Sequence, residues 1–473
     1  NLHIVKTGHK ADRLNQSGLS LPQSLAIPEA TLFWNTGMQF LAQFFKFEEK
    51  NTNWRRELMA GFTGFVTVCY VVLVIPAMLA DAGMNLQAAT IAVIWATAFA
   101  SLLMGLVANF PVIVAPGLGI CAFFSYYVCG PMGLSWQTAL AAVFISGVIF
   151  FLLTVTKIRQ LIIDAVPTDI KHAIVVGLCC FISFIGLKNA GLIVADPSTF
   201  VALGNLHKAE PLLAALGVLL ISALMVRRIK GAMIIGILAV TILGLLLGVS
   251  PLPDLSTLST PSSLTPSETF FELDFNSVFA YGIVTIVFTL TMMDLFDNMG
   301  TLIGLSIRAN MLDHKTGHIE GLEKALFSDS VATMASGVIG TPTCTSYIES
   351  AAAIAEGGRT GIVPIVSAIL FLLCLFALPF VTVVPAYATA SALIVVGGLM
   401  MQSVVHINFK DFSTGMPAFL TIITMPLTFN VATGFGLGFI SYVFLKLLTN
   451  QTKDLNIVTI LVALAFGINF MMR

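Results

Sequence analysis

The sequence predicts an all-α polytopic membrane protein, and three observations support this. Hydrophobic residues make up 57% of the 473 residues and charged residues only 10%, whereas a soluble domain has about 25% charged residues. Apolar stretches recur along the chain at close to the roughly 20 residues that cross a ~30 Å hydrocarbon core. Two of these stretches are interrupted by Gly or Pro at corresponding places in the two halves. The net charge of −1 argues against a nucleic-acid-binding protein, which would usually carry an excess of positive charge.

The expected elements follow in chain order. Residues 1–50 form an N-terminal extension whose end, at 38–47, reads as an interfacial helix. About 14 transmembrane helices follow in two halves: 57–80, 88–108, 114–130, 134–156, 168–188, 210–226 and 231–249, then 277–304, 323–340, 345–357, 361–382, 385–403, 413–429 and 431–448. A polar loop, 251–276, separates the halves. In the last segment, 451–473, the apolar stretch 457–471 is either half-inserted or packed on the bundle.

Loop charges predict the orientation. Cytoplasmic loops carry an excess of Lys and Arg, while the loop 250–276 has neither. We therefore expect a cytoplasmic N-terminus in the cell membrane. The basic residues that fall on the cytoplasmic side are Lys50, Arg55, Arg56, Lys157, Arg159, Arg227, Arg228, Lys230, Arg308, Lys315 and Lys324.

The two interrupted segments are 111–124 and 341–353. In each, a few β-branched residues beside Gly or Pro predict a short strand, and the helix that follows is too short to span alone. Each is the third of seven apolar segments in its half, and because seven is odd the second half must run inverted. Such paired segments point to a transporter's midplane site, since irregular backbone is tolerated at that depth only where it lines a protein cavity.

Asp294 and Asp297 lie in the middle of the eighth apolar stretch. A carboxylate at that depth costs roughly 2.5–3.5 kcal/mol. Their spacing of three places both on one helical face with Thr291 and Thr301, and this polar stripe must face a protein interior or a wet cavity. Glu349, which opens the short helix of the second interrupted segment, either satisfies the helix dipole or contacts a substrate, the interpretation that we favour.

Four motifs make the chain resemble a known family. DLFDNMGTLIG (294–304), TSYIES (345–350), APGLGICAFF (115–124) and GLKNAGLIV (186–194) resemble the adenine/guanine/hypoxanthine permeases, of the nucleobase–cation symporter-2 type with the uracil-permease fold. The resemblance implies 14 helices in two inverted seven-helix repeats. A core domain (51–156 and 277–382) would carry substrate past a gate domain (157–250 and 383–450).

The resemblance also implies a function and its site. The function is uptake of purine nucleobases by proton symport through elevator-like alternating access, without cofactor or metal, in a possible homodimer. Asp297 would hydrogen-bond the base, Glu349 would bind its ring, and Asp294 is a second acid typical of this purine branch. Backbone groups of Ile120, Cys121, Tyr347 and Ile348 would complete the pocket, and Phe123 would either stack on the base or pack in the helix.

Proton coupling is assigned to buried acids. Asp294, Asp297 and Glu349 close together in a low dielectric should not all stay ionised, because desolvation and like charge both favour the protonated form. One acid could then load a proton together with the substrate. The acids assigned to coupling are Asp294, Glu349 and Asp329, the last of which could equally be a structural partner within its helix.

Cys121 departs from the family pattern G-[LM]-G-[LI]-N-A-[FY]-F, in which Asn occupies its position. Asn supplies a donor and an acceptor, whereas a thiol is weak at each. The sequence therefore leaves the preferred base open, and xanthine, uracil or a cytosine-like base is an alternative to the purines named above. It also leaves open whether H⁺ or Na⁺ is the coupled ion. Three rival functions fit the sequence less well. An anion transporter on the same fold would need positive groups at the broken helix ends, where this sequence has acids. An enzyme would need a catalytic set of side chains, and a channel would not need the paired broken helices.

Overall fold

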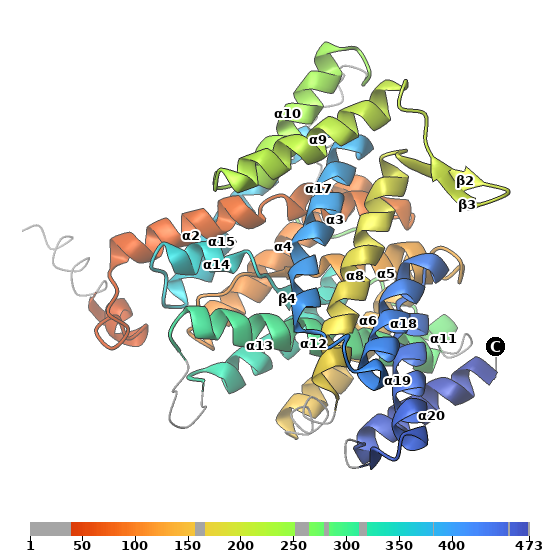
Figure 1. Ribbon diagram of the computed structural model, residues 1–473. Helices are drawn as coiled ribbons and strands as arrows, with labels where there is room; N and C mark the ends of the chain where they lie inside the picture. Colours follow the sequence, from red (N-terminus) through yellow and green to blue (C-terminus); the bar gives the residue numbers. More distant parts are fainter. Residues whose placement is uncertain are drawn as a thin grey trace, which may run out of the picture. The chain divides into compact units, whose positions relative to one another are not determined.

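The chain forms two compact units, Asn1–Glu49 and Lys50–Arg473, shown in the computed structural model of Figure 1. The structure describes residues 39–156, 166–250, 264–278, 283–311, 319–381, 383–452 and 455–471. In the first unit, residues 39–44 are helical and expose Phe40 and Phe44. Lys157, Arg159 and Lys315, on which part of the predicted orientation rests, lie outside the described residues.

Helices dominate the second unit. In the described part of the chain, nine helices are long and apolar enough to cross a membrane, and further apolar helices are shorter. The principal helices are α2 (Trp54–Val68), α3 (Val71–Asp81), α4 (Leu86–Leu106), α6 (Trp136–Val155), α8 (Thr168–Asn189), α9 (Ala209–Val226), α10 (Ala232–Leu246), α12 (Ile283–Arg308), α13 (Leu322–Ile339), α15 (Ile362–Leu373), α17 (Ala386–Met400), α18 (Phe412–Thr428), α19 (Val431–Leu448) and α20 (Ile457–Met471).

Some predicted segments are less regular than the sequence pattern indicates. The segment 57–80 is two helices, α2 and α3, because i→i+3 hydrogen bonds from Val72 to Cys69 and from Leu73 to Tyr70 tighten the backbone between them. The segment 361–382 continues from α15 through the 3₁₀ turn η2 (Cys374–Ala377) to α16 (Leu378–Val381), and 385–403 ends in the 3₁₀ turn η3 (Met401–His406). Among the described helices of at least 18 residues, α13 is too polar to count as an apolar span, because it carries Glu323, Lys324 and Asp329 and buries several Ser and Thr side chains.

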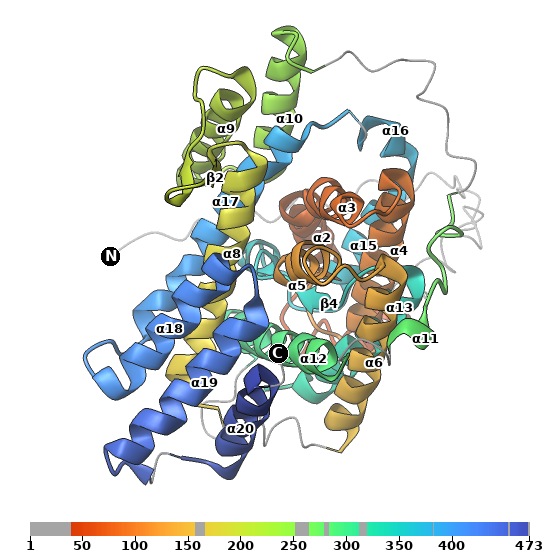
Figure 2. The same ribbon diagram turned by 90° about the vertical axis from the view of Figure 1, so that its right-hand side faces the viewer.

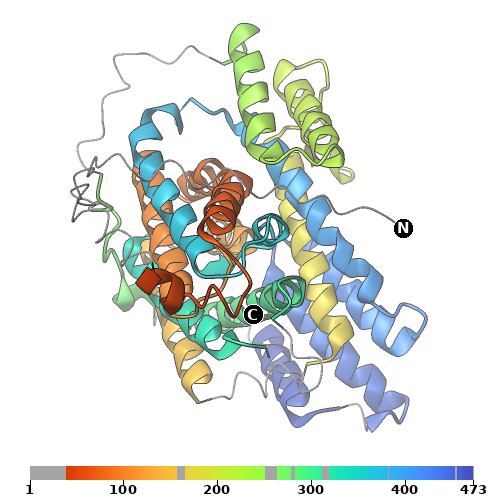
Figure 3. The same cartoon turned by 90° about the vertical axis from the view of Figure 1, so that its left-hand side faces the viewer.

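The helices of the second unit pack as two groups. In one group, α2, α4, α6, α12, α13 and α15 contact one another; in the other, α8, α9, α10, α17, α18 and α19 do. Figures 2 and 3 show the groups side by side from opposite directions. Small residues permit close approach within each group: a Cβ added at Gly361 would collide with the Gly105 carbonyl, and one at Gly397 with the Cys179 carbonyl.

Two short strands from distant parts of the chain pair in the interior. Strand β1 (Val114–Pro116) pairs antiparallel with β4 (Cys344–Ser346), with Ala115 opposite Thr345. Each strand leads into a short helix, α5 (Leu118–Phe123) or α14 (Ser350–Ala355). Both interrupted segments therefore have the strand and the short helix that the sequence predicts.

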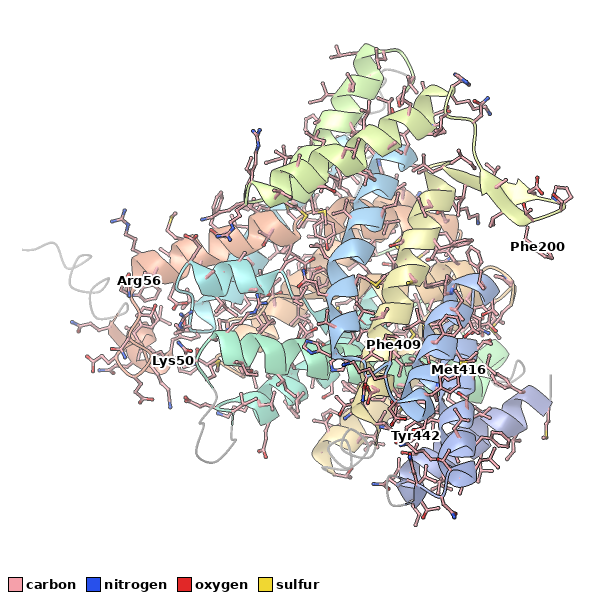
Figure 4. The ribbon with its side chains drawn as sticks, in the orientation of Figure 1. Lys50, Arg56, Phe200, Phe409, Met416 and Tyr442 are labelled. Atoms are coloured by element: carbon pink, nitrogen blue, oxygen red, sulfur yellow. The ribbon has the colours of Figure 1, made fainter. Side chains whose placement is uncertain are left out.

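A second strand pair, which the sequence reading did not predict, follows α8. Strands β2 (Ile193–Asp196) and β3 (Phe200–Leu203) form an antiparallel hairpin. Asp196 caps its turn by accepting hydrogen bonds from the Ser198 hydroxyl (2.5 Å) and from the backbone amides of Ser198 and Thr199. These bonds, that of the Ser198 hydroxyl above all, hold the pKa of its carboxyl below the usual range. Phe200 projects from the hairpin with 86% of its surface exposed, as Figure 4 shows.

Candidate functional site

The pairing of β1 with β4 brings the starts of α5 and α14 together. The Gly117 amide donates to the Thr343 carbonyl (2.9 Å), and the Tyr347 amide donates to the Ile113 carbonyl (3.0 Å). The Tyr347 hydroxyl donates to the Pro116 carbonyl (2.6 Å). Since the first N–H groups of a helix have no partner within the helix, this arrangement concentrates backbone donors in the interior of the unit.

Asp297 and Glu349 are the acids that meet at this place. Asp297 projects from α12, where the Thr345 side chain hydrogen-bonds to its carboxylate and Glu349 is the neighbouring charge. Glu349 precedes α14, and its Oε1 accepts a hydrogen bond from the Tyr70 hydroxyl (2.8 Å). Both predicted substrate-binding carboxylates are therefore half-buried and interact electrostatically with each other, beside the paired strands.

Tyr70 and Thr345 were missed by the sequence reading. Tyr70 lies at the break between α2 and α3 and is fully buried. A buried Tyr hydroxyl usually has a hydrogen-bond partner, so a Tyr in the middle of an apolar stretch was the available signal.

Asp294 faces a different set of groups. Its Oδ1 accepts from the Asn298 amide (2.5 Å) and its Oδ2 from the Thr333 hydroxyl of α13 (3.1 Å). Asn298 in turn accepts a hydrogen bond from the Ser346 backbone amide (2.7 Å). Asp294 and Asn298 are both fully buried, and the hydrogen bond between Asn298 and Ser346 links α12 to β4.

The polar stripe of α12 is thus divided between several neighbours. Thr291 hydrogen-bonds with Ser146 of α6 (3.0 Å), Asp294 with α13, and Asp297 with β4. These residues of the stripe face the protein interior, one of the two surroundings that the sequence predicts, because α6 packs against this helix and Thr333 of α13 hydrogen-bonds to Asp294. Asn298, on the same side, was not predicted.

The remaining predicted residues lie around these acids. Ile120, Cys121, Phe123 and Tyr347 are buried, while Ile348 is 53% exposed. Cys121 and Cys344 are close enough to interact. The Phe123 ring stacks on Tyr127 at 5.3 Å between centroids, which corresponds to the packing alternative for this side chain.

Asp329 is fully buried in α13 and acts electrostatically on Cys344, as Asp294 does. Across the residues that the structure describes, no group of three His, Cys, Asp or Glu side chains could hold a metal ion.

Comparison with known proteins gives the family. Residues 55–437 match the model of a permease family. The chain belongs to this family. A putative permease of Methanocaldococcus jannaschii is 46% identical over 92% of this chain and 98% of its own length. The adenine permease AdeP of Escherichia coli is 39% identical over 91% and 96%, and the guanine/hypoxanthine permease PbuO of Bacillus subtilis is 37% identical over 90% and 99%.

Solved structures with the same fold are more distant in sequence. The transmembrane domain of the cyanobacterial bicarbonate transporter BicA superposes with a TM-score of 0.61 at 16% identity, over 80% of this chain and 97% of that domain. The murine anion transporter Slc26a9 gives 0.58 at 11% identity, over 94% and 77%. The permease is therefore a mostly helical multi-pass membrane protein. Its membership of the permease family confirms the expectation of a transporter and not an enzyme.

Proposed function

We propose that this permease takes up purine nucleobases, namely adenine, guanine or hypoxanthine, and that Asp297 and Glu349 bind the base. The observation that carries the proposal is the meeting of these two carboxylates beside the starts of α5 and α14. A carboxylate accepts the ring N–H groups of a base, and backbone amides donate to its ring nitrogens. Relatives named for adenine or for guanine and hypoxanthine support the substrate class.

The proposed mode of transport is elevator-like movement of a core domain (51–156 and 277–382) past a gate domain (157–250 and 383–450). These domains would be two inverted repeats of seven helices each. The separate packing of the two helix groups and the antiparallel pairing of β1 with β4 support this division. The orientation proposed from the loop charges places the N-terminus in the cytoplasm.

Proton symport is the proposed coupling. Two carboxylates that share a poorly hydrated site disfavour double ionisation, so Asp297 and Glu349 together are suited to hold one proton while the base is bound. Glu349 is our first choice for the proton carrier because Asp297 is a neighbouring negative charge, which favours its protonated form. The Tyr70 hydroxyl, which donates to one of its oxygens, favours the ionised form and would help Glu349 to release the proton. Asp294 and Asp329 remain the other coupling candidates.

Anion transport is the rival function, because the solved structures with this fold include a bicarbonate transporter and an anion transporter. The charged groups that meet here are both acids. They would repel an anion at the position where such a transporter needs to attract it, so an uncharged base fits this site better.

Uptake of radiolabelled adenine, guanine and hypoxanthine, in cells that lack their own purine permeases, tests the proposal. We expect Asp297→Asn and Glu349→Gln to abolish uptake while membrane insertion is retained, and Glu272→Gln, an exposed loop acid, to transport normally. A protonophore should collapse uptake. Wild-type uptake by either site variant would refute the site, and uptake that persists on a sodium gradient alone would refute proton coupling.

A further inference from the structure

A polar cavity lies at one end of the boundary between the two helix groups. Its volume is about 550 Å³, within the roughly 300–1,000 Å³ of small-molecule sites. The ends of α3 and α8, the π-helical turn η1 (Phe124–Val128) and the residue after α18 meet there. We call this cavity the vestibule; the side chains that matter are Asp81, Ser125, Tyr126, Lys188, Asn189 and Phe429.

A hydrogen-bonded chain crosses the vestibule from one helix group to the other. The Tyr126 hydroxyl donates to Oδ2 of Asp81 (2.7 Å) and accepts from the Asn189 amide (2.8 Å). Asp81 ends α3, which packs against α4, and Tyr126 lies in η1, which contacts α6; Asn189 ends α8 of the other group. A carboxylate has about four acceptor positions, so Asp81 can accept further N–H groups while it keeps this bond.

Ser125 has a buried hydroxyl group that makes no hydrogen bond within the described residues. Its side chain is 97% buried, since 3% of its surface is exposed. Among the described residues its hydroxyl has no hydrogen-bond partner, although buried hydroxyls are normally satisfied. Ser125 lines the vestibule, so this hydroxyl is a donor and an acceptor next to the cavity.

Phe429 contributes an aromatic surface at an unusual backbone position. It follows α18 in the left-handed region, with φ of 52°, where Gly is the usual residue. Edge-to-face contacts with Phe181 (6.0 Å) and Phe184 (5.2 Å) fix its ring, and the Lys188 ammonium lies 5.4 Å from its centroid. A bulky residue kept in this conformation often marks a functional position.

We infer that the vestibule is a second, weaker nucleobase site that receives the base before it reaches Asp297; this inference rests on the proposed function. Aromatic rings of Tyr126 and Phe429 suit a planar ligand, and the polar groups suit its N–H and ring-nitrogen edge. The opposite charges of Asp81 and Lys188 balance, which suits an uncharged base better than an anion.

One helical segment connects the vestibule with the proposed central site. Tyr126 and Cys121 are on one apolar helical segment, Leu118–Val128, so the two sites are separated by roughly 8 Å along that axis. In the orientation proposed from the loop charges, the vestibule is at the extracytoplasmic end. A base bound there would compete for the Tyr126 hydroxyl that bridges the helix groups.

Equilibrium binding of radiolabelled adenine, guanine and hypoxanthine to the purified full chain tests this inference. We expect two classes of site in the wild type, of which Asp297→Asn removes only the tighter. The double variant Asp81→Asn, Tyr126→Phe should remove only the weaker class and raise the KM for uptake about three- to tenfold, the effect of losing one or two hydrogen bonds.

Two controls separate the possible results. Glu272→Gln and Phe200→Ala alter exposed residues outside the vestibule and should leave both classes intact. Retention of the tight class shows that the double variant is folded. A single class in the wild type, with unchanged binding and KM in the double variant, would overturn the vestibule site but leave the proposed function standing. Absence of purine binding in every protein, wild type included, would overturn both.

Discussion

The two interrupted segments have the same shape but different chemistry. Each is a three-residue strand followed by a six-residue helix. The first contributes buried, uncharged side chains such as Ile120 and Cys121, whereas the second contributes Thr345 and Glu349. A charge within the membrane is costly, so placing it on one of two paired segments limits that cost while both supply backbone groups. Substitutions in the second segment should therefore affect binding far more.

Glu349→Gln should have the largest effect. The amide keeps the size of the side chain but loses the charge and one acceptor position, so the base loses a charge-assisted hydrogen bond of about 1.5–3 kcal/mol and the proposed proton site. We expect binding of purines to weaken at least tenfold and proton-driven uptake to fall below detection. Equilibrium binding and uptake in proteoliposomes measure the two effects separately.

The matched control is Glu356→Gln at the end of the same helix. Glu356 pairs with Lys230 (2.6 Å), and both side chains are partly exposed. An ion pair of this kind contributes about 0–1 kcal/mol, so binding should stay within about fivefold of the wild type. Equal losses in the two variants would show that the acid at position 349 acts through helix stability and not through the ligand.

Asn298→Ala should rank second, and Ser101→Ala provides its counterpart in the other segment. Asn298 accepts from the Ser346 amide of β4, while the Ser101 hydroxyl accepts from the Val114 amide of β1 (3.1 Å) and donates to its carbonyl (2.9 Å). Each substitution leaves a buried backbone group without that partner, at about 1–3 kcal/mol.

Both variants should therefore lower the thermal unfolding temperature by similar amounts. The affinity for the base should fall about tenfold only in Asn298→Ala, since β4 carries Thr345 and leads to Glu349. Thermal unfolding monitored by size-exclusion chromatography and equilibrium binding test the pair. A greater loss of affinity in Ser101→Ala would reverse the comparison between the segments.

Tyr70→Phe should have a smaller effect that is confined to the second segment. It removes the hydroxyl that donates to Glu349 and leaves the ring in its buried place. The lost hydrogen bond contributes about 0.5–1.5 kcal/mol, which corresponds to a two- to tenfold loss of affinity. Binding across a pH series adds a second readout: the loss should be greatest where Glu349 is ionised, and a pH-independent loss would contradict the proposed contact.

The sequence predicted those helices and site residues that a short stretch of sequence is enough to reveal. Apolar length placed α8 and α19 within a residue or two of their ends, and a charge in an apolar stretch marked Asp297 and Glu349. A single polar residue in an apolar stretch, such as Asn298 or Tyr70, does not reveal which group it contacts, because the contact depends on the register of β1 with β4 and on a break in the first helix. Those features arise from packing between segments that are far apart in the chain.

Cys121 should be the least sensitive position. Its side chain is fully buried among residues that include Cys344 and Tyr347, and a thiol is a weak donor and acceptor. Cys121→Ala removes little more than packing volume, so affinities for adenine, guanine and hypoxanthine should each stay within about threefold, in unchanged rank order. Competition binding with the three bases measures this directly. A tenfold loss for one base alone would show that the thiol reads the ligand, and the first interrupted segment would then take part in recognition as well as in holding the second in place.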